Sequence, residues 1–196
     1  SALMQFAPGR VRRRFADTRG NVSHWSPVDP NAPVNLVEVH QYASQSECIG
    51  TFQGIRDGDP CDLPVYRPWE LRLQTIPPHI GKTSNASWAW QTRIECLGSA
   101  VTVDIPRAST IFAIVPRIEA RLHRFGGGVS ICRFAHECTS SLKVNGQDRL
   151  VRVQLREAAN RPAAIGFQFE ADALRLDVVP PTGLALSGME IPESTK

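Results

Sequence analysis

The chain has 196 residues with 42% hydrophobic content, which suits one folded domain with a sizeable core. Its 15 prolines and 14 glycines interrupt the sequence too often for long helices, which argues against an all-α fold. A net charge of +3 is too small for a general nucleic-acid binder. No apolar run approaches the roughly 18 to 20 residues that span a bilayer, so we expect no membrane partner.

The chain begins at Ser1 without an initiator methionine, and the next residues lack the basic start and apolar centre of a secretion signal. We therefore expect Ser1 to be a terminus made by removal of an upstream segment. A basic cluster, RVRRRFADTR at residues 10–19, follows; its five arginines are Arg10, Arg12, Arg13, Arg14 and Arg19. These arginines are predicted either to contact RNA phosphates or to form a solvated arm against an acidic protein surface.

Prolines mark the end of this basic segment. The stretch HWSPVDPNAP, residues 24–33, has three prolines and little periodicity, which predicts an extended connector. We place a basic, Pro-rich N-terminal arm and connector at 1–33, a jelly-roll β domain at 34–180 and a C-terminal tail at 181–196. The arm lies outside the strand pattern, so it is expected to bury little surface.

The body is rich in short alternating or β-branched segments. Strands are predicted at 34–41, 48–53, 69–76, 87–96, 100–105, 110–115, 117–123, 129–135, 149–157, 164–171 and 174–179. Only 62–70 and 107–113 offer short helical turns. Short strands separated by Gly, Pro and Asn turns predict an all-β, antiparallel sandwich, jelly roll or barrel.

The segment at 149–157 alternates most regularly. Val151, Val153 and Leu155 are predicted to face the core together, with Arg152 and Gln154 between them. Leu150 is expected to add a further apolar contact.

One short motif has side chains that could bind a metal. In CRFAHEC, residues 132–138, Cys132, His136 and Cys138 would share one face of a strand. Zinc usually needs four ligands in paired short spacings, and no second pair exists. We therefore expect buried thiols beside a structural histidine, with no metal or other cofactor. The odd number of cysteines, five, favours a reducing compartment.

No recognisable catalytic motif is present. A G-x-S-x-G nucleophile turn is absent, and the glycines of GGGVS at 126–130 lack the lysine of a phosphate-binding loop. We expect no catalytic residues and no enzymatic activity. The tryptophans, Trp25, Trp69, Trp88 and Trp90, would suit either a sugar or base platform or a packed core; for Trp88 and Trp90, which share a strand face, we expect packing.

Two segments resemble a known family. VRVQLREAANRPAAIGFQFEADALRLDVV at 151–179 resembles the closing strand pair of picorna-like coat proteins, and QYASQSECIGTF at 41–52 looks like the entry into their jelly roll. The resemblance is closest to the small coat protein of picorna-like plant viruses of the comovirus and fabavirus kind, in the secovirus family.

This resemblance implies a structural capsid protein with an eight-stranded antiparallel jelly roll and an extended N-terminal arm. It implies cleavage from a polyprotein at Ser1, contacts with copies of itself and with a larger coat subunit, and an icosahedral virion assembled in the host cytoplasm. The basic cluster matches no family motif, so genomic RNA stays open as a further partner. Two alternatives remain: a β-sandwich module that binds a carbohydrate or other ligand, and a hydrolase on a β scaffold.

Overall fold

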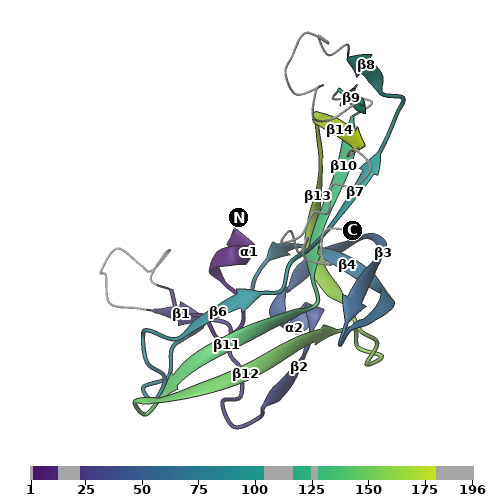
Figure 1. The fold of residues 1–196 in the computed structure, drawn as a ribbon. Helices are drawn as coiled ribbons and strands as arrows, with labels where there is room; N and C mark the ends of the chain where they lie inside the picture. The colour runs from purple at the N-terminus through teal and green to yellow at the C-terminus, as the bar shows by residue number, and fades with distance from the viewer. Residues whose placement is uncertain (1, 13–22, 104–116, 125–127, 180–196) are drawn as a thin grey trace. The chain divides into compact units, whose positions relative to one another are not determined.

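The computed structural model describes residues 2–12, 23–103, 117–124 and 128–179, and this part of the chain folds mainly as β-strands (Figure 1). Its two helices have four residues each, and neither is long and apolar enough to cross a membrane. The prediction of an all-β fold is therefore confirmed. In chain order the elements are α1 (Ala2–Gln5), β1 (His24–Trp25), β2 (Val34–Glu38), α2 (Val39–Tyr42), β3 (Gln45–Arg56), β4 (Asp59–Glu70), β5 (Gln74–Thr75), β6 (Asn85–Trp88), β7 (Gln91–Cys96), β8 (Val101–Val103), β9 (Arg117–His123), β10 (Val129–Ala135), β11 (Glu137–Val144), β12 (Gln147–Arg156), β13 (Ala164–Ala171) and β14 (Ala173–Val179).

Within the described ranges the strands form four sheets. Their orders are β3-β4-β13-β10-β7, β2-β12-β11-β6, β14-β9-β8 and β1-β5. The chain divides into two compact units, the first with residues 1–92 and 133–167 and the second with residues 93–132 and 168–196. The division falls inside β7, β10 and β13, so each of these strands contributes residues to both units.

The pairing of the strands is mixed. Most neighbours are antiparallel, but β12 pairs in parallel with β2, where Arg152 lies opposite Val34, and β13 pairs in parallel with β4, where Ala164 lies opposite Val65. The prediction of a purely antiparallel fold is therefore wrong. Parallel partners lie far apart in the sequence, because a short hairpin cannot join them, and alternation within one strand does not reveal such a partner.

Two tight hairpins connect neighbouring strands in the first unit. β3 and β4 are joined through Asp57 and Gly58, whose φ angles are 51° and 95°, and β11 and β12 are joined through Asn145 and Gly146, at 49° and 83°. Positive φ at both central residues is what a two-residue type I′ turn requires. The sequences Asp-Gly and Asn-Gly therefore fix the register of both hairpins.

The predicted strands match the structure unevenly. The strands at 117–123, 129–135 and 164–171 are confirmed at both ends as β9, β10 and β13. β4 and β11 were missed, and the helical turn expected at 62–70 is part of β4. The segment expected as one strand at 34–41 ends as a strand at Glu38 and continues as α2. The elements expected at 107–113 and 110–115 lie outside the described residues.

β4 was missed because three prolines interrupt it. Pro60, Pro64 and Pro68 stand at every fourth position of this strand. Backbone N–H groups alternate between the two edges of a strand, so the three missing donors fall on one edge, and the other edge keeps its hydrogen bonds. The strand therefore tolerates prolines that, in the sequence, indicate a turn.

The core of the first unit lies on the inner face of the β2-β12-β11-β6 sheet. Val151, Val153 and Leu155 of β12 are buried, which confirms the predicted alternation. Leu150 is 72% exposed, so its predicted apolar contact is wrong. Because side chains alternate along a strand, Leu150 lies on the outer face, opposite to Val151. Trp88 packs in the same core and contacts Trp90 with ring centroids 6.3 Å apart, which confirms the expected packing of these two indoles.

The N-terminal segment is packed into this core. Leu3, Ala7 and Val11 belong to the buried cluster, as do Trp25 and Val28 of the predicted connector. The expectation that residues 1–33 bury little is therefore wrong for the described residues. Leu3, Ala7 and Val11 are spaced by four residues, but Pro8 and Gly9 interrupt this pattern, so the sequence did not indicate a buried helical face.

Three buried donors hold this segment in place. The Tyr42 hydroxyl donates to the carbonyl oxygen of Phe6 at 2.9 Å, the Trp88 indole donates to that of Leu3 at 2.9 Å, and the Ser140 hydroxyl donates to that of Pro8 at 2.6 Å. Each bond satisfies a backbone carbonyl that no sheet ladder uses. The segment is thus fixed by side chains of the β-sheet body.

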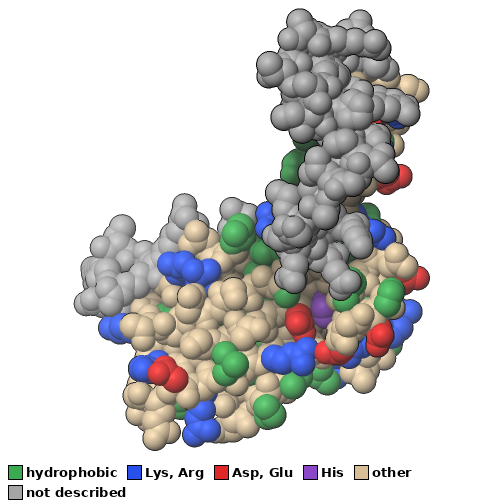
Figure 2. Space-filling view, viewed as in Figure 1, with side chains coloured by type: hydrophobic (Ala, Val, Ile, Leu, Met, Phe, Trp, Pro, Cys, Tyr) green, Lys and Arg blue, Asp and Glu red, His purple; other side chains and the backbone are tan. Residues whose placement is uncertain are grey.

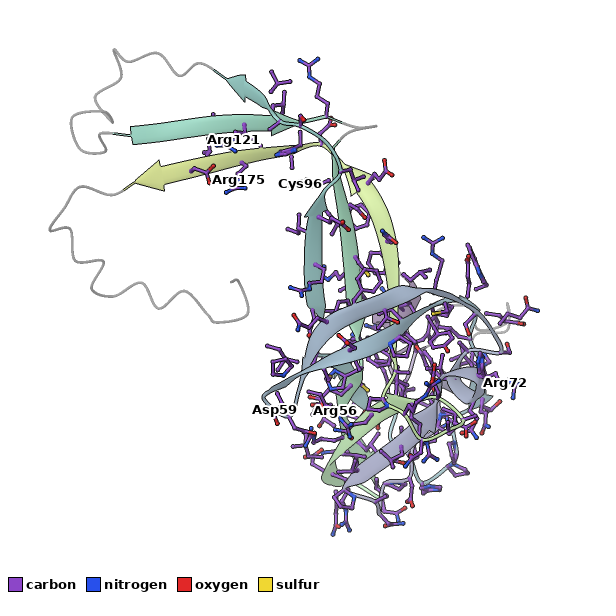
Figure 3. The ribbon with its side chains drawn as sticks, turned by 90° about the vertical axis from the view of Figure 1, so that its right-hand side faces the viewer. Arg56, Asp59, Arg72, Cys96, Arg121 and Arg175 are labelled. Atoms are coloured by element: carbon purple, nitrogen blue, oxygen red, sulfur yellow. The ribbon has the colours of Figure 1, made fainter. Side chains whose placement is uncertain are left out.

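The second unit contains the β14-β9-β8 sheet, which is antiparallel throughout. Leu174 of β14 and Val101 of β8 both lie opposite Leu122 of β9, so the three residues form one row on the same side of the sheet. On the other side, Arg121 and Arg175 lie opposite each other on neighbouring strands (Figure 3).

Candidate functional site

Of the predicted RNA-contact residues, Arg10 and Arg12 are described. Nη1 of Arg10 donates to the carbonyl oxygen of Met4 at 2.7 Å, and the backbone of Arg12 exchanges two hydrogen bonds with His24, at 2.9 and 2.8 Å. Both guanidinium Nε atoms are buried without a hydrogen-bond partner. Burial and the charge of Arg12 lower the pKa of Arg10. These two arginines therefore lie close enough to repel each other on a packed segment. The other predicted residues, Arg13, Arg14, Arg19 and Ser1, lie outside the described residues.

A charged network joins the β11–β12 hairpin to the β3–β4 turn in the first unit. Nη2 of Arg152 on β12 contacts Oδ1 of Asp57 in the β3–β4 turn at 2.9 Å and Oε2 of Glu137 on β11 at 2.7 Å. Nε2 of His136 lies 3.9 Å from the same Glu137 oxygen. No sequence pattern indicates this network, because Asp57, Glu137 and Arg152 are not close neighbours along the chain.

The network shifts the protonation of its members. The hydrogen bond from Arg152 lowers the pKa of Asp57, and the two carboxylates raise that of Arg152. Burial acts to raise the pKa of Glu137, but hydrogen bonds from Arg152 and Gln154 outweigh it, so this pKa is lowered. Burial lowers the pKa of His136, and the nearby Glu137 charge opposes the shift only in part. Around neutral pH the network therefore holds ionised carboxylates beside a neutral histidine.

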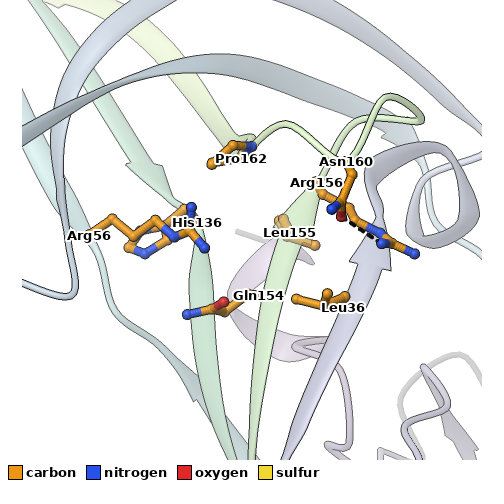
Figure 4. A pocket seen from close by; sticks show the side chains of 8 residues that line it. All are labelled: Leu36, Arg56, His136, Gln154, Leu155, Arg156, Asn160 and Pro162. Carbon is orange, nitrogen blue, oxygen red and sulfur yellow. Dashed lines mark hydrogen bonds between the residues drawn. The ribbon is translucent and has the colours of Figure 1, made fainter.

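A pocket of about 100 Å³ opens beside this network (Figure 4). Five polar side chains and three apolar ones line it: Arg56, His136, Gln154, Arg156, Asn160, Leu36, Leu155 and Pro162. Within it, Nη1 of Arg156 donates to Oδ1 of Asn160 at 2.7 Å. Asn160 has a positive φ of 60° and stands in the turn before β13, which the Asn-Arg-Pro sequence predicted. The turn was predicted, but its part in a pocket was not.

The β14-β9-β8 sheet has an apolar face on which three side chains are exposed. Leu174 and Leu176 of β14 are 60% and 55% exposed, and Val101 of β8 is 55% exposed. The register places all three on the same side of the sheet. The opposite side is charged: Nε of Arg175 lies 2.9 Å from Oδ1 of Asp177, and Arg121 lies 3.9 Å from the same carboxylate. The sheet is therefore amphipathic, with its apolar side chains still in contact with solvent.

The outer face of the β2-β12-β11-β6 sheet also exposes apolar side chains. Val34 and Leu36 of β2 and Leu150 of β12 are 42%, 48% and 72% exposed. We call these three residues the outer stripe. Figure 2 shows hydrophobic side chains at the surface among charged and polar ones on one face of the molecule.

The other predicted features fall in separate places. Cys132 is buried in β10, Cys138 is buried in β11, and His136 stands at the bend between them, so the three do not share one strand face as predicted. In the described part of the chain, no three His, Cys, Asp or Glu side chains are grouped as a metal site.

Trp69 is 65% exposed, and the guanidinium carbon of Arg67 lies 5.3 Å from the centre of its ring.

Comparison with known proteins found no matching protein-family model, no matching curated protein and no matching solved structure. The described surfaces and the pocket are therefore the basis on which a function can be argued.

Proposed function

We propose that this protein is a structural capsid subunit that assembles with copies of itself and with a larger coat subunit into an icosahedral shell around RNA. The all-β fold and the resemblance of residues 41–52 and 151–179 to small coat proteins of picorna-like plant viruses support the proposal. A jelly-roll arrangement of the sheets, cleavage from a polyprotein at Ser1 and a place in the virion belong to the same proposal. No catalytic reaction is assigned to the chain.

The exposed apolar face of the β14-β9-β8 sheet is the observation on which the proposal chiefly rests. A sheet with one charged and one apolar face normally covers the apolar face, because apolar surface in water costs about 25 cal/mol per Å². Leu174, Leu176 and Val101 are each more than half exposed. Large exposed apolar patches on a folded protein are typical of protein–protein contacts. A subunit of a shell needs such contacts on more than one side, and the outer stripe offers a second surface.

Co-expression with a candidate larger coat subunit tests this proposal. We expect the parent chain to sediment as large particles, and the variant Leu174→Lys with Leu176→Lys to remain as smaller species, because two charges would be buried in the contact. Arg175→Gln on the same strand is the matched control, since Arg175 lies on the opposite side of the sheet. A parent chain that stays monomeric with its partner, or a double variant that assembles fully, would contradict the proposal.

The RNA contact is tested by dividing the arginines into two sets. Each lost phosphate contact with single-stranded RNA should reduce the slope of log affinity against log salt by about 0.7. Replacing Arg13, Arg14 and Arg19 by Gln should therefore reduce the slope by about 2, and replacing Arg10 and Arg12 by about 1.4, if all five residues contact phosphates. An unchanged slope in both sets would contradict RNA contact by these arginines and would favour a role in protein contacts.

One observation favours the alternative, a β-sandwich module that binds a carbohydrate or another ligand. Trp69 exposes 65% of its surface, and Arg67 stacks on its ring. Exposed indole rings serve as stacking platforms for ligands that present a flat apolar face. Titration of the monomer with oligosaccharides, followed by tryptophan fluorescence, tests this alternative; Trp69→Ala should abolish a true response.

A further inference from the structure

The polar side chains that line the pocket beside the charged network come from four parts of the chain. Arg56 comes from the end of β3, His136 from the bend between β10 and β11, Arg156 from the end of β12, and Asn160 from the turn before β13. Figure 4 shows Arg56 and His136 on one side of the space and Arg156 with Asn160 on the other. Cationic and N–H groups therefore approach one small space from different directions.

Two of the donors in this lining have no acceptor. The side chain of His136 is 4% exposed, and its Nε2 atom has no hydrogen-bond partner. Its Nδ1 atom lies 3.5 Å from Nε2 of Gln91, an amide nitrogen that can only donate, so Nδ1 accepts and Nε2 bears the proton. The buried Nε of Arg156 is likewise without a partner. Unpaired buried donors are costly, and an acceptor from outside the chain would lower that cost.

The charges around the pocket leave an excess of positive charge. Asp57 and Glu137 are both hydrogen-bonded to Arg152, which lies outside the lining, and Glu137 also lies 3.9 Å from Nε2 of His136. In the described part of the chain, Arg156 has Asn160 as its partner and forms no ion pair. The closest carboxylate oxygen to Arg56 is a long contact with Asp57 at 3.7 Å. An anion would therefore find two guanidinium groups that are not already neutralised at short range.

We propose that this pocket binds a phosphate group, held by Arg56, His136 and Arg156. At about 100 Å³ the space is smaller than the roughly 300 to 1,000 Å³ cavities that enclose drug-sized ligands, and it suits a small polar group. Arginine forms charge-assisted hydrogen bonds with carboxylates and phosphates alike, but a tetrahedral phosphate has acceptor oxygens in more directions than a planar carboxylate, which suits donors from separate directions. Leu155, which is buried, and Pro162 form apolar walls whose low local dielectric strengthens these charge-assisted bonds.

This site does not depend on the proposed capsid role, because it needs no second subunit. The phosphate has two possible sources, inorganic phosphate and the phosphate of a mononucleotide. Both sources present a phosphate group to the pocket. They differ in whether a nucleoside is attached to it and extends out of the pocket.

Titration calorimetry on the full chain tests the site, with inorganic phosphate, adenosine monophosphate and acetate at constant ionic strength. We expect the parent to bind phosphate and Arg156→Gln and Arg56→Gln each to weaken binding by about tenfold, because each removes a charge-assisted hydrogen bond. Arg149→Gln is the matched control: Arg149 is an exposed arginine of the same β12 strand outside the lining, so its loss should leave binding unchanged. Circular dichroism verifies that each variant is folded.

The outcomes separate the possibilities. Tighter binding of adenosine monophosphate than of inorganic phosphate identifies a nucleotide as the source, and equal or weaker binding identifies free phosphate. The proposal fails if the folded parent does not bind phosphate, if acetate binds equally well, or if folded Arg156→Gln and Arg56→Gln bind as the parent does.

Discussion

The hydroxyl of Tyr42 donates a 2.9 Å hydrogen bond to the carbonyl oxygen of Phe6, and both groups are buried. This bond links α2 to the N-terminal segment across 36 residues of sequence. Burial raises the pKa of Tyr42 far above the usual range, so the hydroxyl remains a donor at any pH of interest. The segment that bears Arg10 and Arg12 is thereby part of the folded body.

Removal of this hydroxyl tests the attachment. Tyr42→Phe removes the buried hydrogen bond to the Phe6 carbonyl, so we expect the free energy of unfolding to fall by about 1 kcal/mol in urea denaturation. Trypsin should also cleave after Arg10 faster than in the parent, because the segment opens more often. Tyr66→Phe is the control: its hydroxyl contacts Glu157 and should leave cleavage at Arg10 unchanged. Equal cleavage in both variants would argue that the bond does not hold the segment.

The register of β12 predicts the effect of a buried charge. Val153 has no exposed surface, so Val153→Asp should lower the free energy of unfolding by more than about 3 kcal/mol, through an unpaired carboxylate in an apolar core. Leu150→Asp, on the exposed face of the same strand, should change it by less than about 0.5 kcal/mol. Urea denaturation measures both values, and comparable losses in the two variants would refute the register.

Acid should destabilise the protein in two steps. Burial depresses the pKa of His136 below its usual 6.5, so below this pH the unfolded chain binds more protons than the folded chain and stability falls with falling pH. The charged groups that face His136 are Arg56, Asp57, Glu137 and Arg152. Asp57 and Glu137 have lowered pKa values, so their stabilising effect is lost only below their usual 3.8 and 4.5.

His136→Gln isolates the first step. Unfolding in urea at pH 7.5 and pH 5.5 should show a smaller loss of stability in this variant than in the parent, because glutamine does not titrate. An equal loss in parent and variant would show that another group is responsible for the first step.

The cysteines should react in two classes. Burial raises the pKa of Cys132 to about 11 and that of Cys138 to about 12, so both thiols stay protonated and shielded at pH 8. Cys48 and Cys96 are exposed and should be alkylated by iodoacetamide within minutes, with the half-buried Cys61 slower. Mass spectrometry of peptides gives the order of labelling, and urea should make all five react. Early labelling of Cys138 in the native protein would contradict its burial.

The sequence predicted features that depend on neighbours along the chain. Alternation identified β12 and β13, and the inward set Val151, Val153 and Leu155 follows from a period of two. Two missed strands also had a local signal: Asp57-Gly58 and Asn145-Gly146 are strong hairpin turns, and each predicts a strand on both sides. The prolines of β4 outweighed the signal of the first turn, and the strand before the second turn, β11, was also not predicted.

Other features depend on residues that meet only in the folded chain. The bridge of Arg152 to Asp57 and Glu137, the parallel pairing of β2 with β12, and the exposed face with Leu174 and Leu176 have no local pattern. The phosphate pocket combines β-strand ends with a turn, and only the turn was visible in the sequence. Alternation tells which side chains share a face, but not whether another part of the chain covers that face.

The parallel pairing of β2 with β12 has a consequence for synthesis on the ribosome. Val34 lies opposite Arg152, so β2 emerges more than 100 residues before its partner exists. At about 5 to 20 residues per second, this delay lasts roughly 6 to 24 s. During this time Val34 and Leu36 belong to an unpaired strand with free backbone donors and acceptors, the kind of segment that chaperones bind and that pairs with other nascent chains. The four-stranded sheet can therefore close only late in translation, and neighbouring ribosomes on one message would be the most immediate source of mispairing.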